Sequence, residues 1–397
     1  MFRPGEVLVQ KYGGSSLATP ERILKVAERI ADQIRAGRRV AIVVSATGDT
    51  TDDLITLLQQ VNRDADAREL DQLMATGEIA SCSLMASALK RCGMRAHSFN
   101  AFNLDIQTDT LFGAAEIKRF GRMERLAETL RRGGVAVVAG FQGITPDGDL
   151  TTLGRGGSDI TAVALARELG QKVCEKFTDE DGVYTADPRL VPTARKIWHL
   201  NYDEMETLAQ YGNGILHPRS ISYARAAGIR IHVRSSFSHE EGTLVGPDGD
   251  ATVPVKSIAC DRKQALVEIR GIPIPERPAL PTGFRISAHE WIPAGTGRLH
   301  GRFAFKTADT FDALPELWSA AATWQADEVV FSSRLRFLTL VGCGFSQDAS
   351  TAGQYQKVLE QCQIRPLLFQ HDGLRVTVAV DEDAAETALQ ELHRSFP

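Results

Sequence analysis

The stretch TTLGRGGSD, residues 151–159, decides the fold and the chemistry predicted for this sequence. It follows the apolar run GGVAVVAGF, typical of a buried strand, and precedes residues 160–169, which have a helical pattern. Its three glycines let backbone amides approach an anion, and a helix N-terminus adds unpaired N–H donors and a favourable dipole. A purely structural left-handed turn with a capping aspartate would suit the same glycines, so both interpretations stay open here.

Two charged residues in this stretch point to chemistry. Arg155 can donate paired hydrogen bonds to a carboxylate or a phosphate, and Asp159 can orient a nucleophile or hold a metal ion. Both should lie near the carboxyl ends of strands, where open α/β sheets bind their ligands.

The composition indicates a globular chain without a nucleic-acid or membrane partner. Of the 397 residues 43% are hydrophobic, and the net charge is -5 with acids and bases interspersed. No apolar run reaches 18 residues, the N-terminus has no leader pattern, and the six cysteines form no CxxC pair. We therefore expect a cytoplasmic protein with reduced cysteines.

Strand-like and helix-like segments alternate from residue 5 to about residue 235. The apolar runs VLVQKYG, VAIVVSA, VAVVAGF and KVCEKFT are separated by helical patterns, such as the one from Glu21 to Ala36. This alternation is typical of a three-layer α/β/α fold with a mostly parallel sheet. We expect this first domain to cover residues 1–243.

The rest of the chain has a different element order. Residues 238–254 are rich in glycine, proline and acids and look like a linker. From Ser333 the pattern predicts β-α-β-β-α, one strand short of a βαββαβ module, and residues 253–261 can supply that strand. We expect a linker and first strand over 244–263, the remainder of this ferredoxin-like module over 333–397, and an inserted, divergent module over 264–332.

The inserted module should have an unusual beginning. Strands are expected at 266–272, 301–307 and 327–333, with a helix at 309–322. A normal first helix near residues 273–284 is not expected, because the four prolines there would each cost about 3 kcal/mol in a helix interior.

A second anion-binding pattern ends the first apolar strand. In KYGGSS, residues 11–16, Lys11 supplies a point charge, Gly13 and Gly14 let the backbone wrap a phosphate, and the serines add donors. The GxxxxGK[ST] order of a P-loop is absent. The pattern predicts a different phosphate cradle, with a surface lysine before a turn as the structural alternative.

Three other segments allow a structural as well as a functional interpretation. The loop from Thr47 to Asp53 can simply cap a helix. Glu78 follows a glycine in a helix expected over 70–90, and it either pairs with an ammonium group or lies on a solvated face. Arg219, at the start of a helix, is either a phosphate ligand or a surface residue.

The segment FTDEDGVYTADPR, residues 177–189, follows another strand. Its acids, such as Asp179, suit ribose hydroxyls, a base amine or magnesium through water, and Tyr184 offers a flat face to a purine. An acidic turn is the structural alternative. Without HExxH, HxxxH or GxSxG patterns, the sequence gives no support to a metalloprotease or a serine hydrolase.

Taken together, KYGGSS, VVSATGDTTDDL, GFQGITPDGDLTTLGRGGSD, FTDEDGVYTADPR and GILHPRS resemble the aspartate kinases of the amino acid kinase superfamily. The similarity is dense from residue 5 to about residue 243. The C-terminal third is similar to the family's paired ACT domains mainly in architecture, although VGCGF and ALQELHRSF fit the second one well.

The resemblance implies transfer of the ATP γ-phosphate to the β-carboxylate of L-aspartate, the first step in making aspartate-family amino acids such as lysine and threonine. Magnesium would bridge the ATP phosphates through waters, with no dedicated protein cage. In this pattern Lys11 and Asp159 are catalytic, with Asp159 orienting Lys11. Aspartate would contact Ser15, Thr47, Glu78, Arg155 and Ser158, and ATP would contact Lys11, Gly13, Gly14, Thr178, Asp179, Tyr184 and Arg189.

Three departures from the family pattern affect these expectations. Gly214 in GNGILHP replaces a lysine that normally faces the ATP phosphates, so a substitute such as Arg219 or Arg189 is required. Ser15 replaces the usual threonine and keeps its hydroxyl. The proline-rich stretch IPIPERPALP lies where the first ACT module presents its effector loop, which predicts absent or altered feedback inhibition by lysine or threonine.

Two rival functions remain at this point. One is a kinase for a related amino or acyl acid, although a free ammonium is required if Glu78 binds it. The other is a catalytically weak sensor in which the ACT-like part binds an amino-acid effector. ACT modules usually complete their sheets with a second copy, so we also expect a homodimer.

Overall fold

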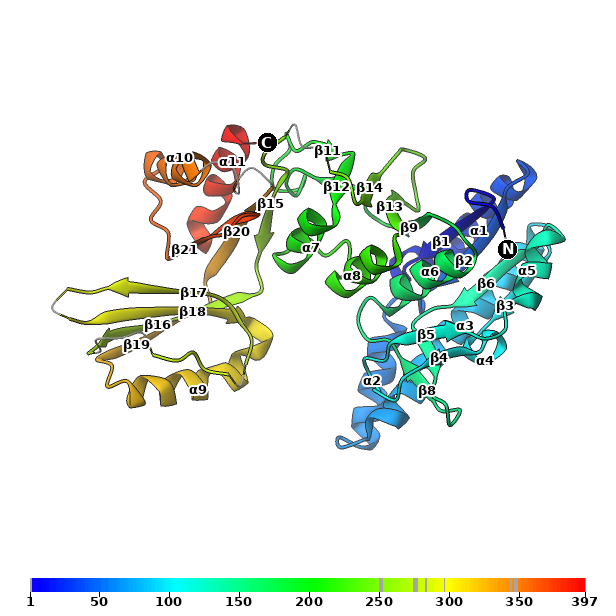
Figure 1. The fold of residues 1–397 in the computed structure, drawn as a ribbon, viewed down its shortest axis with the longest axis horizontal. Helices are drawn as coiled ribbons and strands as arrows, with labels where there is room; N and C mark the ends of the chain where they lie inside the picture. The colour runs from blue at the N-terminus through cyan, green and yellow to red at the C-terminus, as the bar shows by residue number, and fades with distance from the viewer. Residues whose placement is uncertain are drawn as a thin grey trace. The chain divides into compact units, whose positions relative to one another are not determined.

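The computed structural model describes residues 2–249, 253–273, 278–282, 284–295, 297–342, 345 and 349–396. The chain forms two compact units that are interleaved in sequence. Figure 1 labels most of their helices and strands. Unit 1 contains Met1–Val183, Lys196–Glu206 and Ile215–Asp250, and unit 2 contains Tyr184–Arg195, Thr207–Gly214 and Ala251–Pro397.

An eight-stranded sheet forms the centre of unit 1. Its strand order is β12-β14-β13-β9-β1-β2-β6-β3, and every neighbouring pair is parallel except β13 with β14. The predicted mostly parallel sheet is therefore confirmed. Its strands are β1 (Val7–Tyr12), β2 (Arg39–Val44), β3 (Ala96–Phe99), β6 (Val135–Ala139), β9 (Val173–Thr178), β12 (His199–Asn201), β13 (Arg230–Ser235) and β14 (Thr243–Gly246).

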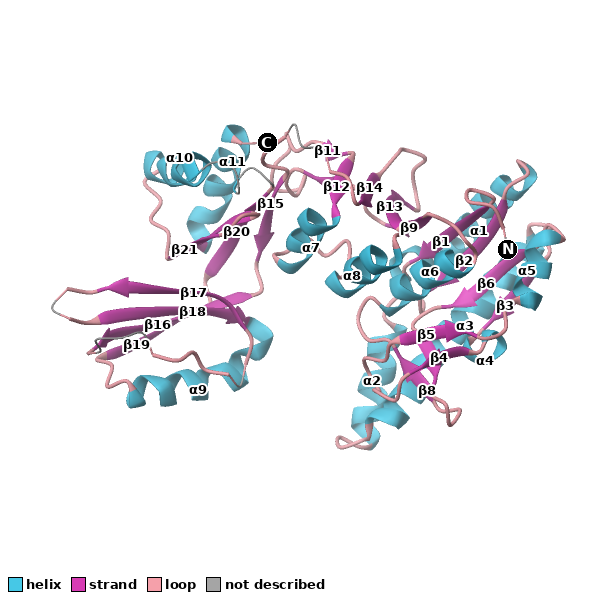
Figure 2. Ribbon diagram, in the orientation of Figure 1, coloured by secondary structure: helices cyan, strands magenta, loops and turns pink. Residues whose placement is uncertain are grey.

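Helices cover both faces of this sheet (Figure 2). Tyr12 of β1 lies in a core shared with α1 and α3, whereas its neighbour Lys11 points the other way, towards α6. Residues 157–166 of α6 are all buried, which explains why this helix has no polar face. The helices are α1 (Pro20–Arg35), α2 (Thr50–Val61), α3 (Ala67–Arg91), α4 (Ala101–Leu104), α5 (Glu124–Arg131), α6 (Gly157–Glu168), α7 (Tyr202–Gln210, shared between the units) and α8 (Pro218–Ala227).

A small sheet of order β5-β4-β7-β8 combines two strands that precede β6 in the chain, β4 and β5, with two that lie between β6 and α6, β7 and β8. The apolar run ending at Phe141 was expected to lead straight into the glycine turn, but a hairpin of β7 and β8 intervenes. The buried Asp71 of α3 fixes this hairpin by accepting hydrogen bonds from the backbone N–H of Thr152 (2.7 Å) and of Gly113 (2.8 Å). These strands are β4 (Ile106–Thr108), β5 (Ile117–Phe120), β7 (Gln142–Ile144) and β8 (Leu150–Thr152).

Unit 2 contains two four-stranded antiparallel sheets, of order β15-β20-β22-β21 and β17-β18-β16-β19. Leu340 and Val378 of the first pack with Tyr355 and Leu389 of α10 and α11. Phe303 of the second packs with α9. The elements of unit 2 are β15 (Ser257–Asp261), β16 (Gln264–Ile272), β17 (Ile286–Pro293), β18 (Leu299–Lys306), α9 (Thr310–Thr323), β19 (Glu328–Ser332), β20 (Leu335–Val341), α10 (Ala349–Gln361), β21 (Leu368–His371), β22 (Arg375–Asp381) and α11 (Ala385–Ser395). Apart from these sheets, β10 (Val183–Tyr184) and β11 (Lys196–Ile197) form a separate two-stranded ribbon.

Two expectations for the second half of the chain need correction. Residues 243–246, assigned to the end of the first domain and the start of the linker, form β14, which pairs with β13 and β12 in the large sheet. β17 was not predicted, because ISAHEWIP lacks regular alternation of apolar and polar residues. The described residues between 273 and 284 contain no helix, as expected, while residues 274–277 and 283, and positions 343–344 of VGCGF, lie outside the described residues.

None of the helices described here is both long enough and apolar enough to cross a membrane.

Candidate functional site

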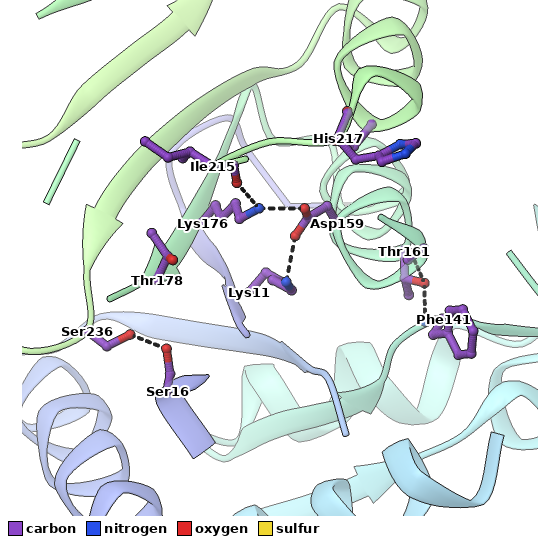
Figure 3. Close-up of polar contacts among 12 residues, drawn as sticks. Lys11, Ser16, Phe141, Asp159, Thr161, Lys176, Thr178, Ile215, His217 and Ser236 are labelled. Atoms are coloured by element: carbon purple, nitrogen blue, oxygen red, sulfur yellow. Dashed lines mark hydrogen bonds and ion pairs between the residues drawn. The ribbon is translucent and has the colours of Figure 1, made fainter. Parts of the chain in front are cut away.

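Two lysines hold one buried aspartate in unit 1 (Figure 3). Lys11 Nζ lies 2.8 Å from Asp159 Oδ1, and Lys176 Nζ lies 2.7 Å from Asp159 Oδ2. Lys176 Nζ also donates a hydrogen bond of 2.5 Å to the carbonyl oxygen of Ile215. The exposed fractions of the three side chains are 10% for Lys11, 7% for Asp159 and 11% for Lys176. We call these three residues the lysine–aspartate cluster.

The fold places this cluster through strand register. Lys11 of β1 and Lys176 of β9 are direct partners across a parallel pair, so their side chains leave the sheet on the same face. Asp159 lies in the first turn of α6, which covers that face. An acid there is also favoured by the helix dipole. Two like charges side by side would repel, and the carboxylate between them offsets this.

The electrostatics of the cluster leave one excess positive charge. Burial alone would raise the pKa of Asp159, but the two ammonium groups lower it to about 2, so the carboxylate stays ionised near neutral pH. Burial lowers the pKa of Lys176, and the charge of Asp159 opposes this shift. With both lysines charged, the cluster has two positive charges and one negative charge. Such a site favours the arrival of an anion.

The glycines after β1 bring three strand ends together. Gly13 donates its N–H to the carbonyl of Phe177 at the end of β9 (3.3 Å), and Gly14 accepts a hydrogen bond from the N–H of Gly48 after β2 (3.1 Å). A Cβ atom on Gly14 would lie 3.0 Å from the carbonyl oxygens of Ala46 and Gly48. Position 14 therefore requires a glycine, because any side chain would collide with backbone carbonyl groups that cannot easily move.

Glu78 of α3 is buried, with an exposed fraction of 3%. Burial raises its pKa to about 7, although a hydrogen bond with the Ala46 backbone and the charge of Lys11 act in the opposite direction. Its Oε2 atom is buried without a hydrogen-bond partner among the described residues. The solvated-face interpretation of Glu78 is therefore wrong, and a buried carboxylate without a full set of partners suits a cationic ligand.

The adjacent glycine, Gly77, lets α3 approach the loop after β2. A Cβ atom on Gly77 would lie 2.9 Å from the Cβ of Ala46. The sequence suggested close approach to a ligand at this glycine, and the close approach found is to Ala46. Gly77 therefore positions Glu78.

The glycine turn before α6 is tightly enclosed but presents one exposed charge. Gly154 and Gly156 have φ values of 71° and 76°, and Cβ atoms there would come within 2.7 Å of the Gly113 carbonyl and of His217, respectively. Arg155 between them is exposed, and among the described residues its guanidinium has no ion pair or hydrogen bond. The turn therefore presents Arg155 at the surface, where its guanidinium is available for a ligand.

Arg219 supports this turn from α8. Its guanidinium donates to the carbonyl oxygens of Leu153 (2.6 Å) and Ala114 (3.2 Å). It is neither a surface residue nor a free phosphate ligand, the two interpretations that the sequence left open. On the other side of the turn, the buried Ser158 faces Gly140. A Cβ atom added to Gly140 would lie 2.7 Å from the Cβ atom of Ser158.

Comparisons with known proteins agree with this arrangement. A model of the amino acid kinase family matches residues 6–235. An aspartokinase of Thermus thermophilus is 38% identical over 402 residues, which cover 98% of each chain. The chain belongs to the aspartokinase family. Escherichia coli aspartokinase III, solved with aspartate and ADP, has a TM-score of 0.73 at 23% identity, with 98% of this chain and 99% of that chain covered.

A second structure of E. coli aspartokinase III, solved with lysine and aspartate, has a TM-score of 0.79 at 23% identity and covers 99% of this chain and all of that one. At these identities the two structures show a shared fold, which extends over the whole length of this member of the aspartokinase family.

The residues that the aspartokinase pattern assigns to ATP fall in both units. In unit 1, Asp179 Oδ1 accepts hydrogen bonds from Thr178 Oγ1 (2.8 Å) and from Ser15 Oγ (3.4 Å). Tyr184 and Arg189 belong to unit 2. There Arg189 binds Asp187 through Nε (2.9 Å) and through a second nitrogen (3.0 Å). Thr47, half-buried in unit 1, accepts a hydrogen bond at its carbonyl oxygen from Thr50 Oγ1 (2.6 Å), and the two hydroxyls lie 3.1 Å apart.

A metal site made by protein side chains alone does not fit what the structure contains. No group of three His, Cys, Asp or Glu side chains gathers as metal ligands in the described ranges. Both oxygens of Asp159 already face lysines.

One member of the lysine–aspartate cluster, Lys176, was not among the site residues expected from the sequence. It lies in the apolar strand KVCEKFT, and a lysine in a strand buried on both faces is unusual enough to have been noticed. The missing signal was its partner, because the proximity of Lys176 to Asp159 depends on strand order.

Proposed function

We propose that this chain transfers the γ-phosphate of ATP to the β-carboxylate of L-aspartate, forming 4-phospho-L-aspartate and ADP. A carboxylate oxygen of aspartate forms a new bond to the γ-phosphorus. The bond from that phosphorus to the oxygen bridging the β-phosphate breaks, and its electron pair leaves with ADP. The acceptor is already ionised, so no general base is needed, and catalysis depends on positioning and charge neutralisation.

The observation that carries this proposal is the lysine–aspartate cluster next to Gly13 and Gly14. Its excess positive charge lies where the ends of β1 and β9 meet, with the glycine backbone beside it. Lys11 can neutralise charge on the transferring phosphate while Asp159 holds its ammonium in place.

Two side chains suit a free α-amino acid as the acceptor. The buried Glu78 would bind the ammonium group, and the exposed Arg155 would bind the α-carboxylate with paired hydrogen bonds. We propose hydroxyl contacts from Ser15, Thr47 and Ser158. An N-acylated acceptor would leave Glu78 without a cation.

We propose that Thr178, Asp179, Tyr184 and Arg189 bind the nucleotide. Magnesium would arrive bound to the ATP phosphates and keep its water ligands, because magnesium is commonly held by substrate phosphates with few protein ligands. Its charge would add to the neutralisation that the lysines provide.

The decisive experiment measures ADP release from MgATP with L-aspartate, L-glutamate or N-acetyl-L-glutamate as the acceptor. Hydroxylamine added to the same reactions traps the acyl phosphate as a hydroxamate. We expect both signals with aspartate alone. Faster turnover of glutamate than of aspartate would show that the chain is a kinase for a related amino acid. If folded protein binds ATP but turns over none of the three acceptors, the result would favour the alternative of a catalytically weak amino-acid sensor.

Other features of the chain are proposed on the same basis. The catalytic domain would span residues 1–243 together with the rest of β14, a span within which residues 184–195 and 207–214 belong to unit 2. Two ACT modules would follow, one over 264–332 and one from 253–261 and 333–397. We propose a cytoplasmic homodimer in which the response to a lysine or threonine effector is absent or altered. Aspartokinase III of E. coli has been solved with lysine, which makes lysine the first effector to test.

A further inference from the structure

This chain lacks a lysine at position 214 and has another lysine, Lys176, near that position. Gly214 stands where the aspartokinase pattern has a lysine facing the ATP phosphates. The structure places the ammonium of Lys176 against the carbonyl of Ile215, the residue that directly follows Gly214. The same ammonium binds Asp159, the partner of Lys11.

We propose that Lys176 supplies the second ammonium of the phosphoryl-transfer site, contacting the phosphates of ATP and replacing the lysine absent at position 214. The inference rests on the proposed function and identifies how this chain compensates for its departure from the pattern. Lys11 and Lys176 would then flank the transferring phosphate, with Asp159 holding both.

The charge balance supports a role beyond pairing with Asp159. One lysine would be enough to neutralise this carboxylate, and Lys11 already lies 2.8 Å from it. A second buried ammonium adds a desolvation cost and repulsion from its neighbour across the strands. The pair becomes favourable when a phosphate enters and contributes the missing negative charge.

Both arginines first considered as substitutes have hydrogen-bond partners on the protein outside the lysine–aspartate cluster. Arg219 donates to the carbonyls of Leu153 and Ala114, so it supports the glycine turn. Arg189 binds the carboxylate of Asp187 with two of its nitrogens. Lys176, in contrast, lies in the cluster itself.

Position 214 can accept a lysine, which makes a transplant test possible. Gly214 has no positive φ angle, and an added Cβ would meet no atom within 4 Å. Gly214→Lys therefore restores the family pattern without backbone strain.

The test compares Lys176→Met, Lys176→Gln and the double variant Lys176→Met/Gly214→Lys with the parent chain. Lys172→Met is the matched control, since Lys172 is an exposed lysine just before β9. Turnover is measured with MgATP and the acceptor that the parent uses. Calorimetry measures binding of a non-hydrolysable ATP analogue, and melting temperatures show that each variant is folded.

We expect both single variants to lose roughly 100-fold in kcat, comparable to removing one preorganised charge donor, and to bind the ATP analogue about 10-fold more weakly. The aspartate KM should change less than about 3-fold, and the double variant should recover at least about 10-fold in kcat. Lys172→Met should match the parent.

Folded single variants that keep the parent's kcat and analogue affinity would overturn the proposal, because Lys176 would then only balance the charge of Asp159. A folded double variant as slow as Lys176→Met would overturn the assignment to the place of residue 214. If the parent phosphorylates another acceptor, or none, the proposed function fails, while binding of the ATP analogue still decides the role of Lys176.

Discussion

At the scale of single residues, the proposed substrate ligands Glu78 and Arg155 would recognise a small amino acid in two different ways. One side chain is buried and short of partners, and the other is exposed and free of ion pairs among the described residues. Burial makes the Glu78 carboxylate sensitive to pH, whereas an arginine stays charged at any pH of interest. Their contributions can therefore be separated by pH as well as by mutation.

Glu78 should set a pH dependence for aspartate binding. Because its pKa is raised to about 7, the free protein loses the ionised form below neutral pH. We expect kcat/KM for aspartate to fall about tenfold per pH unit below pH 7 and the profile of Glu78→Gln, weaker throughout, to lack this decline. Glu69→Gln, at an exposed position in the same helix, should keep the parent profile.

The same shift has a consequence for stability. A carboxyl group whose pKa is raised on folding stabilises the fold at low pH, and this contribution is lost as the pH rises from 4.5 to about 7. The melting temperature of Glu78→Gln relative to the parent should therefore increase across this interval. A constant difference would mean that Glu78 is not desolvated.

Arg155→Ala should affect aspartate much more than ATP. Loss of a paired, charge-assisted interaction with the α-carboxylate should raise the aspartate KM by about 10- to 100-fold. The ATP KM should change less than about 3-fold. Arg38→Ala, at another exposed arginine, should alter neither value. Equal effects on both substrates would show that Arg155 contacts the phosphates instead.

At the scale of elements, the contact between α3 and the loop after β2 determines where Glu78 lies. Gly77→Ala should force these two elements apart, because the new Cβ would lie 2.9 Å from the Cβ of Ala46. We expect a raised aspartate KM and a stability loss of about 1–3 kcal/mol, typical of overpacking. Steady-state kinetics and chemical denaturation measure the two effects.

A compensating substitution tests whether the collision with Ala46 causes the effect of Gly77→Ala. Ala46→Gly combined with Gly77→Ala removes the colliding atom and should restore most of the aspartate affinity. Gly353→Ala in α10 is the control, since a Cβ there meets no atom within 4 Å and alanine favours a helix. If the double variant binds aspartate no better than Gly77→Ala, the contact with Ala46 is not the cause.

The elements also show what a single sequence can reveal. The large parallel sheet and most elements of unit 2 could be predicted, because alternation and apolar periodicity are local signals. The hairpin of β7 and β8 was missed, since short strands in a polar loop leave little pattern. The position of Lys176 beside Asp159 depends on the pairing of β1 with β9, whose partners, such as Lys11 and Lys176, are 165 positions apart in the sequence, so the pairing has no local signature.

At the scale of the whole molecule, the unusual first ACT-like module predicts an absent or altered response to amino-acid effectors. Pro273, Pro278 and Pro281 lie in this module, and the described residues 273 and 278–282 are not helical. We expect neither lysine nor threonine to inhibit at micromolar concentration. A kinase assay titrated with each amino acid measures this, and inhibition at those concentrations would contradict it.

The antiparallel sheets of unit 2 make a homodimer a natural expectation. β21 ends the first sheet, and β17 and β19 lie at the edges of the second, whereas the other edge strand of the first, β15, is mostly buried and donates the N–H of Ile258 to the carbonyl of Thr185. Open sheet edges favour pairing with another chain. α9 also carries Phe311 and Trp318 with exposed fractions of 90% and 55%. Light scattering after size exclusion should give twice the 43.3 kDa chain mass, and a monomer at micromolar concentration would refute the dimer.

The interleaving of the two units has a consequence for how such a chain can be recombined. Residues 184–195 and 207–214 belong to unit 2 although the sequence of unit 1 surrounds them, and Val191 is part of the apolar core shared with α10 and α11. A chimera joined to a relative at one crossover near residue 250 would combine those segments with a foreign core. To exchange regulation between relatives, all three segments of unit 2 (184–195, 207–214 and 251–397) would have to be exchanged together. We therefore expect the two units to be inherited together.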